Sequence, residues 1–509
     1  MRQRTGDTST FSQTTAVLKT SLGVLLAVGL AGLPTLAAER PSITVGQTFL
    51  TGGLDPAEGS AGWALVSHGV AENLFAVSRD GRVVPALAES ALRQADGSWR
   101  VTLHRDRVFS DGSPVDAATV AAALNRSGEK NPVARASAGR LTFAPLDAAT
   151  LRVTTERPTP VLPAVLAEWA FPVYRETPGG MVFTGPFAVT SFTAGSRLDL
   201  TPNTYYAEAE TRPEVIVRRI ADGQALALAF KAGEVDLAFH LPVETLPMLK
   251  ADPALAVRTF PVGYQYMMWI NTRRGALTDV RVRKAIDIAI DRADLVKAAR
   301  AGIPATGAYP ALYPFAATGA LEQDAAKAEA LLDAAGWKRG AGGMRTKNGK
   351  PLELTLWAYP QRPDLITFQP VIRAALQKIG IAATTHVSET ATETAKSGAF
   401  DLFLWAQHTA PAGDPAFFLG LFLASGGGNN FAGWSNPTFD TVMTRLGEAA
   451  DGKARAELAR EAQAIVAEEA PVAFLATPEW HVGVSKRLAS YEPWGSDYYV
   501  IRDDLRVAR

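Results

Sequence analysis

Helical and strand-like patterns alternate along the second half of the chain, and no other feature limits the fold as strongly. Residues 224–234 have the apolar spacing of a helix, and "VDLAFH" (235–240) is typical of the buried strand that follows it. The segment 454–476 likewise predicts a helix that ends at Pro471 and leads into a short apolar strand. Layers of helices and strands, rather than a helical bundle or a β-sandwich, produce this alternation. The sequence therefore predicts an α/β fold.

The first half of the chain contains clear start and stop signals for local structure. Residues 97–104 ("GSWRVTLH") alternate apolar and polar side chains, which predicts a half-buried strand. The strand should end at "FSDGSP" (109–114), because this segment combines the turn residues Asp, Gly and Pro. Asp116 then stands where its carboxylate can cap a helix at 117–126.

Three further segments of the second half have equally specific signals. Residues 278–299 predict a long amphipathic helix with a break near Asp291. Residues 325–337 predict another helix, which Gly336 should end. Asn348–Gly349 lies between two strand-like runs, and this dipeptide favours a type I′ hairpin.

The N-terminal 38 residues have the composition of an export signal. Basic residues precede an uncharged apolar run at 21–33, and the small residues at 35–38 are typical of a cleavage site near Ala37 or Ala38. A membrane anchor is the alternative, but a spanning helix needs about 20 apolar residues and this run is shorter. The chain contains no cysteine, so it lacks both disulfides and a site for lipid attachment. We therefore expect a signal peptide at 1–38 and a soluble periplasmic protein that is not a lipoprotein.

The overall composition and the motifs argue against several functional classes. With 509 residues, 47% of them hydrophobic, the chain is long enough for two or three domains, and its formal net charge of +0 does not favour nucleic-acid binding. The sequence has no G-x-S-x-G elbow, no H-E-x-x-H pair and no phosphate-binding loop. Its six histidines show no metal-ligand spacing. We expect no catalytic residue, no metal site and no cofactor, which leaves a binding protein as the simplest interpretation.

An ordered set of motifs then points to one family. The segment "VVPALAESALRQADGSWRVTLHRDRVFSDGSPVDAATVAAALNR" (83–126) resembles a signature of the family 5 extracytoplasmic solute-binding proteins, which are dipeptide, oligopeptide and nickel receptors of ABC importers. Further segments resemble this family in the same order along the chain: "LDPAEG" (54–59), "FTGPFAV" (183–189), "PNTYYAE" (202–208), "ALAFKAGEVDLA" (227–238) and "VRVRKAIDIAIDRADLV" (280–296).

The resemblance implies a two-lobed periplasmic-binding-protein clamp of the cluster C type, in which an additional third subdomain accompanies the lobes. Two lobes would close like a hinge over a buried ligand. We expect residues 39–78, 182–265 and 479–509 to form lobe one, residues 79–181 to form the extra subdomain, and residues 266–478 to form lobe two.

The resemblance also suggests candidate binding residues. Peptide-binding members carry Trp-x-x-Asp where this chain has "WAQH" (405–408), so Trp405 is kept and His408 replaces the carboxylate that pairs with a peptide ammonium group. Asp414 of the following "GDP" matches the Asp-Pro of the family and is an alternative partner for that ammonium group, although a turn or capping role is the preferred interpretation. Trp63 and Trp405 would stack on the ligand, with Tyr264 near the hinge. The glycine-rich loop at 424–437 would bring two amides to the cleft, so that polar selectivity is assigned to His408, Asn429 and Asn430.

These observations predict a periplasmic receptor that captures a small peptide or peptide-like solute and delivers it to an ABC permease. One alternative on the same fold is a receptor for a nickel–chelator, an opine or another carboxylate-rich solute. The segment "EWAFP" (168–172) weakens the nickel version because it lacks the arginine that such a receptor carries there. A remote alternative is an exported hydrolase. We expect a monomer that binds no nucleic acid.

Overall fold

The computed structural model describes residues 40–508, except 136–137, 158, 160, 341 and 361. The predicted signal peptide at 1–38 lies outside these described residues. Within them, no helix combines the length and the apolar character needed to cross a bilayer.

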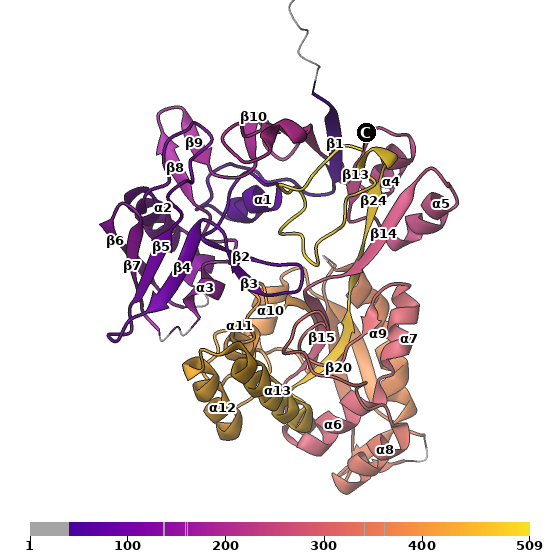
Figure 1. Ribbon diagram of the computed structural model, residues 1–509. Coiled ribbons are helices and arrows are strands. Elements are labelled where there is room, and N and C mark those ends of the chain that lie inside the picture. Colours follow the sequence, from indigo (N-terminus) through magenta and orange to yellow (C-terminus); the bar gives the residue numbers. More distant parts are fainter. Residues whose placement is uncertain are drawn as a thin grey trace, which may run out of the picture. The chain divides into compact units, whose positions relative to one another are not determined.

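The first sheet has seven strands in the order β10-β11-β12-β1-β13-β24-β14. Strand β1 pairs in parallel with β12 and β13, whereas the other neighbours are antiparallel. Figure 1 shows the yellow strand β24, from near the C-terminus, among strands from much earlier in the chain. The strands are β1 Ser42–Gln47, β10 Phe187–Thr193, β11 Arg197–Pro202, β12 Glu214–Arg219, β13 Leu237–Phe239, β14 Ala256–Pro261 and β24 Glu479–Val484. Helices α1 Ala61–Ser67, α4 Gly223–Lys231 and α5 Leu246–Lys250 connect parts of this region.

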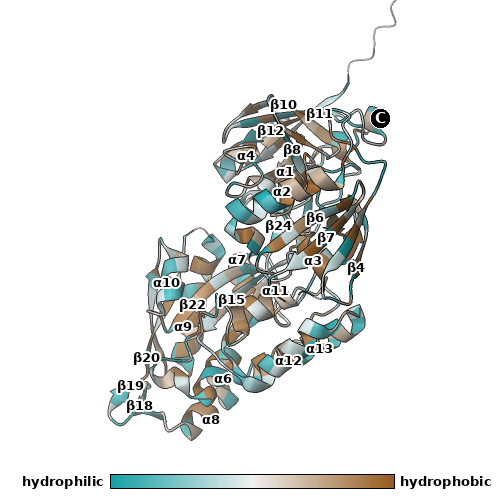
Figure 2. Ribbon diagram, turned by 90° about the vertical axis from the view of Figure 1, so that its left-hand side faces the viewer, coloured by the Kyte–Doolittle hydropathy of each residue, from teal (hydrophilic) through white to brown (hydrophobic). Residues whose placement is uncertain are grey.

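The second sheet has six strands in the order β16-β23-β15-β22-β20-β21. Its central strand β15 carries Trp269, whose side chain is fully buried and stacks on Phe422. The strands are β15 Tyr264–Ile270, β16 Ile303–Pro304, β20 Glu353–Ala358, β21 Ala382–Val387, β22 Leu402–His408 and β23 Val472–Thr477. Accompanying helices are α6 Val280–Ala289, α7 Arg292–Ala299, α8 Ala325–Ala334, α9 Pro363–Lys378, α10 Ala391–Ser397, α11 Ala416–Phe418, α12 Pro437–Glu448 and α13 Gly452–Glu469. Hydrophilic residues recur along α12 and α13, while strand β15 is mainly hydrophobic (Figure 2).

A third, antiparallel sheet has the strand order β4-β5-β7-β6, and helix α2 packs beside β6. Its apolar residues form a separate core with α2 and α3. The elements are β4 Ala88–Arg93, β5 Trp99–Leu103, β6 Leu141–Asp147, β7 Thr150–Thr155, α2 Ala117–Lys130 and α3 Leu162–Val165. Smaller sheets pair β2 Phe75–Val77 with β3 Val83–Pro85, β8 Tyr174–Thr177 with β9 Gly180–Phe183, and β17 Lys338–Arg339 with β18 Arg345–Lys347 and β19 Lys350–Pro351.

The structure confirms the local predictions that rest on helix-capping residues and on turn residues. The Asp116 carboxylate accepts a hydrogen bond from the backbone N–H of Thr119 at 2.8 Å and so caps α2. The expected break near Asp291 separates α6 from α7, and this residue caps α7. Asn348 and Gly349 have φ values of 52° and 74°, as a type I′ turn requires.

The α/β class is confirmed by the three large sheets and the helices that pack on them. The strands of these sheets come from the ranges expected for lobe one, the extra subdomain and lobe two, except that β15 crosses the expected boundary after residue 265. Tyr264 and Gln265 of β15 pair with His408 and Gln407 of β22. The division of the chain into lobes at these boundaries stays a prediction.

Candidate functional site

Strands β15 and β22 bring two of the candidate residues directly together. Their antiparallel register places Tyr264 opposite His408, with ring centroids 5.0 Å apart. Trp405 lies on the same strand as His408, and its ring is 5.4 Å from that of Tyr359. The start of β15 and the end of β22 therefore form one wall of the site.

His408 itself is a packing residue in this arrangement. Its side chain is 5% exposed and stacks on Tyr498 at a centroid distance of 5.3 Å. Gly263 lies against the imidazole so closely that a Cβ atom there would be 2.6 Å from it. Burial lowers the pKa of His408 to about 3, so the ring is neutral at physiological pH. Polar selectivity through His408 stays a prediction, since the structure places its ring between Tyr264 and Tyr498.

An open groove of about 660 Å³ lies beside Trp405. Its lining consists of Tyr359, Arg362, Trp405 and Ala406, together with Glu389, Thr390 and the first turn of α10, which includes Glu393. Arg362 stands immediately before α9, and its guanidinium lies 5.3 Å from the centre of the Tyr264 ring. Among the described residues, no carboxylate forms a hydrogen bond or close ion pair with Arg362. The groove thus presents a guanidinium beside an aromatic face, with the carboxylates of Glu389 and Glu393 elsewhere in its lining.

A smaller cavity of about 80 Å³ lies at the ends of β1, β13 and β24, which are inner strands of the first sheet. Aromatic rings dominate its walls. The ring centroids of Phe49 and Trp63 are 4.6 Å apart, and those of His240 and Trp480 are 4.9 Å apart. The Tyr264 ring lies near both sites, 5.8 Å from the ring of Trp480 and 5.3 Å from the Arg362 guanidinium, although Tyr264 is part of neither lining. The complete lining is Gln47, Thr48, Phe49, Trp63, Ser67, Phe239, His240, Trp480, Asp497 and Val500.

Asp497 is the acidic residue in the lining of this cavity. Burial raises the pKa of Asp497 to about 6, although its own backbone, the charge of Arg362 and a hydrogen bond from Trp63 lower it in part. The Asp497 carboxylate in the small cavity and the Arg362 guanidinium in the groove therefore attract each other electrostatically. Opposite charges separated by an aromatic surface are suited to a ligand with two charged ends.

The structure places Trp63 in the lining of the small cavity, Trp405 in that of the groove and the Tyr264 ring near residues of both, but it does not bring Asn429 or Asn430 there. The Asn430 amide donates to the carbonyl oxygens of Ala424 and Trp434 and accepts from the Trp434 N–H, so it holds its own loop together. The backbone N–H of Asn429 bonds to the Leu421 carbonyl in the same loop. A ligand role for these two amides stays a prediction.

Sequence reasoning missed Arg362, Asp497, Trp480 and Phe49. A signal for Arg362 was present, since it follows a predicted strand and directly precedes Pro363, which starts a helix. A charged residue at such a loop is a common binding position. Asp497 had no comparable signal, because the C-terminal segment around it shows no periodic pattern.

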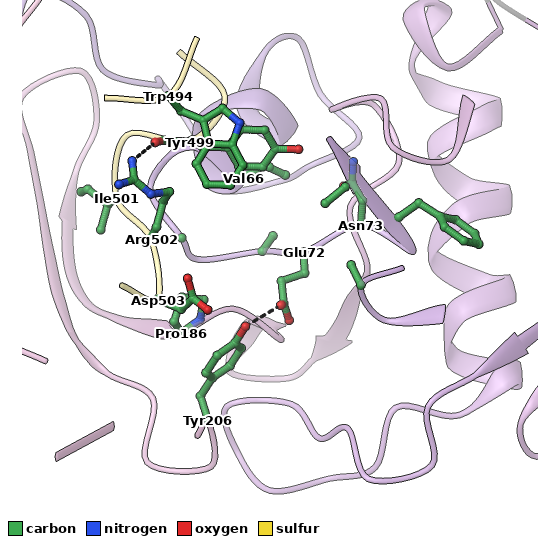
Figure 3. A pocket seen from close by; sticks show the side chains of 15 residues that line it. Val66, Glu72, Asn73, Pro186, Tyr206, Trp494, Tyr499, Ile501, Arg502 and Asp503 are labelled. Atoms are coloured by element: carbon green, nitrogen blue, oxygen red, sulfur yellow. Dashed lines mark hydrogen bonds between the residues drawn. The ribbon is translucent and has the colours of Figure 1, made fainter. Parts of the chain in front are cut away.

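Figure 3 shows another cavity, of about 180 Å³, between α1, the segment before β2 and the C-terminal segment. Glu72 points toward Tyr206, whose hydroxyl donates to one carboxylate oxygen at 2.9 Å. The other carboxylate oxygen is buried and has no partner among the described residues. Burial raises the pKa of Glu72 to about 7, against the opposing charge of Arg107 and the bond from Tyr206.

This Glu72 environment predicts an unusual pH dependence of stability. Because the folded-state pKa lies above the ordinary value of 4.5, the folded protein binds the proton more tightly than the unfolded chain, and stability falls as pH rises from 4.5 to 7. We expect Glu72→Gln to unfold with a free energy about 1–2 kcal/mol higher than wild type at pH 8. Near pH 4 the two proteins should be equal. Urea denaturation at both pH values measures this difference.

The control for this experiment is Glu89→Gln, because Glu89 lies on β4 and is exposed. This variant should follow wild type at both pH values. A Glu72→Gln effect of equal size at pH 4 and pH 8 would show that the lost charge is not responsible.

Comparison with known proteins identifies the class to which this site belongs. The profile of the bacterial extracellular solute-binding proteins, family 5 (middle), matches residues 82–430. The chain therefore belongs to the family 5 bacterial extracellular solute-binding proteins, as the sequence motifs predicted.

Individual relatives and solved structures agree with this assignment. The chain is 26% identical over 476 residues to the glutathione-binding protein GsiB of Salmonella choleraesuis, a match that covers 88% of this chain and 90% of that protein. It is 27% identical over 393 residues to the nickel-binding periplasmic protein of Escherichia coli, covering 72% and 74% of the two chains. The crystal structure of a nickel ABC transporter protein from Bacillus halodurans superposes with a TM-score of 0.81 at 26% identity, covering 92% of this chain and all of that one. These matches confirm the two-lobed solute-binding fold.

Proposed function

We propose that this protein is a periplasmic receptor of an ABC importer, and that its cargo is a small peptide-like solute with a carboxylate group. The observation that carries this proposal is Arg362, a guanidinium in an open groove without a carboxylate partner among the described residues. A carboxylate can accept two parallel hydrogen bonds from a guanidinium, which makes this pairing both strong and directional. The positive end of α9, which begins at Pro363, adds to the attraction.

The aromatic residues around Arg362 support a peptide-like cargo over a small inorganic anion. Tyr264, Tyr359 and Trp405 offer ring faces and edges beside the guanidinium. Such surfaces bind the planar amides and apolar parts of a peptide, while a few polar groups fix its orientation. The glutathione-binding relative supports the same class of solute.

The positions of these residues also support a mechanism for signalling that cargo is bound. Arg362 and Trp405 belong to the second sheet and its helices, whereas Trp63 and Trp480 belong with the first sheet. A ligand that contacts both groups favours the closed arrangement through contacts that are absent when the lobes separate. Micromolar binding, about −8 kcal/mol in free energy, is enough for this role.

Native mass spectrometry of the protein purified from a periplasmic extract tests the proposal directly. We expect a co-purifying solute of low mass that carries a carboxylate and is released unaltered on unfolding. Calorimetry with glutathione and short peptides then measures affinity. Recovery of cleaved products after prolonged incubation would contradict a receptor function and support the hydrolase interpretation instead.

A second candidate cargo is a nickel chelate. The similarity to the Escherichia coli nickel-binding protein favours it, and the carboxylates of a chelator would suit Arg362 equally well. Calorimetry with Ni(II)–histidine, alongside histidine alone and glutathione, distinguishes the two cargoes. Preference for the nickel complex over every peptide would replace the peptide-like proposal.

A further inference from the structure

The small cavity at the ends of β1, β13 and β24 has the chemistry of a cation site. Phe49, Trp63, Phe239 and Trp480 supply aromatic surfaces around a single carboxylate, that of Asp497. Aromatic faces carry negative electrostatic potential and attract ammonium groups, most strongly where water is excluded. The residues that line this cavity include no lysine or arginine.

The size of the cavity limits what it can hold. Its volume of about 80 Å³ compares with about 30 Å³ for one water molecule in the liquid, so it has room for a group of a few non-hydrogen atoms. A primary ammonium or a methylated ammonium fits this space. To reach Arg362, the rest of the ligand has to pass Tyr264, whose ring lies 5.8 Å from that of Trp480 and 5.3 Å from the guanidinium.

Two further observations mark the cavity as a binding position. The half-buried Asp497 carboxylate forms no ion pair with another described residue, although taking a carboxylate out of water is costly without a counter-ion. His240 on the opposite wall has a φ of 67°, in the left-handed region that favours glycine. Strained backbone of this kind is concentrated at ligand sites, where the surrounding structure enforces it.

We infer that this cavity receives the ammonium group of a zwitterionic cargo, with Asp497 as its counter-ion and with Trp63 and Trp480 against its sides. The inference rests on the proposed function, because it adds a second anchor to the cargo that Arg362 holds by its carboxylate. Arg362 precedes α9, which accompanies the second sheet, whereas Asp497 lies in the C-terminal segment and lines a cavity with residues of the first sheet. Cargo with only negative charges would leave Asp497 unpaired, so the preferred class is an amino-acid-like or peptide-like zwitterion.

The experiment compares ligands that differ only at the amine. Calorimetry of the folded full chain at pH 7.5 uses glutathione with N-acetylglutathione, and Ala-Ala-Ala with its N-acetyl form. We expect wild type to bind the free amines about 30-fold more tightly, a ratio typical of a buried charge pair. In Asp497→Asn this preference should fall to about twofold, while the N-acetylated probes keep their wild-type affinity.

The matched control is Glu492→Gln, which removes one negative charge from the same C-terminal segment. Glu492 is 57% exposed, pairs with Arg258 and does not line the cavity, so this variant should keep the wild-type preference. Equal wild-type affinity for free and acetylated probes, or an unchanged preference in a folded Asp497→Asn protein, would overturn the ammonium site and leave the proposed receptor intact. Failure of every carboxylate-bearing probe to bind wild type would instead overturn the proposed function and the ammonium site together.

Discussion

Replacing Arg362 by alanine is expected to weaken the binding of carboxylate-bearing cargo about 100-fold. The guanidinium lies in the groove beside Trp405 without a carboxylate partner among the described residues, so its pairing capacity is available to a ligand. Removing it leaves the ligand carboxylate in a partly desolvated site without a positive charge. Arg362→Lys should recover only part of the affinity, because an ammonium cannot form the paired hydrogen bonds of a guanidinium. Calorimetry with the recovered cargo, or with glutathione, measures both variants.

The control variant removes a similar charge from another position of α9. Arg373 also belongs to α9 but is exposed and does not line the groove, so Arg373→Ala should bind like wild type. Probes whose carboxylate is converted to an amide provide a second check, since they should bind wild type and Arg362→Ala with similar affinity. A loss in Arg362→Ala that is as large for the amides as for the acids would contradict a carboxylate contact and indicate a general disturbance of the groove.

Much of the local structure could be predicted because single residues dictate it. A carboxylate at Asp116 can satisfy the free N–H groups of the following helix turn, and Asn348–Gly349 suits the positive φ values of its hairpin. These interactions involve neighbours in the sequence, so no knowledge of the tertiary structure was needed. The aromatic candidates Trp63, Tyr264 and Trp405 were identifiable for a related reason, since they stand at the ends of predicted elements.

The charged residues of the site were harder to find because distant segments create their environment. Asp497 meets Trp63 and Trp480 only because the C-terminal segment lies against the first sheet. His408 has the sequence context of a ligand contact, yet the Tyr498 ring, 90 residues away, covers it. Asn430 has the right chemistry for a ligand but uses its amide within the loop. Competition for hydrogen bonds and the packing of remote segments are not visible in a local pattern.

Asp414 makes both a local contact, which the sequence predicts, and a contact with a distant helix, which it does not. The sequence suggested a turn or capping residue, and its carboxylate does accept a hydrogen bond from the Ala416 N–H at 2.8 Å. It also accepts two hydrogen bonds, of 2.9 and 2.8 Å, from Arg455 of α13. The Arg455 and Asp414 side chains are only 5% and 13% exposed. Asp414 therefore joins the loop after β22 to a helix, in addition to its local role.

Replacing Asp414 by alanine is expected to lower the free energy of unfolding by about 3–5 kcal/mol. The Arg455 guanidinium would keep its bonds to the carbonyl oxygens of Leu446 and Ala449 but would lose its counter-ion in a buried position. The cost comes mainly from that unpaired charge, so removing the charge as well should restore part of the stability. The double variant Asp414→Leu with Arg455→Met should thus be more stable than Asp414→Ala alone. Chemical denaturation followed by tryptophan fluorescence measures all three proteins.

An exposed ion pair between α12 and α13 is the control for this prediction. Arg445 of α12 and Glu461 of α13 are 54% and 46% exposed, and solvent screens their attraction. Glu461→Ala should therefore cost less than about 1 kcal/mol, although it too breaks a contact of α13. If Asp414→Ala proved no more destabilising than Glu461→Ala, or if the apolar double variant were the least stable of the set, burial of the Arg455 charge could not be the source of the effect. The attachment of α13 would then depend on apolar packing, in which Ala459, Ala462 and Val466 are already fully or almost fully buried.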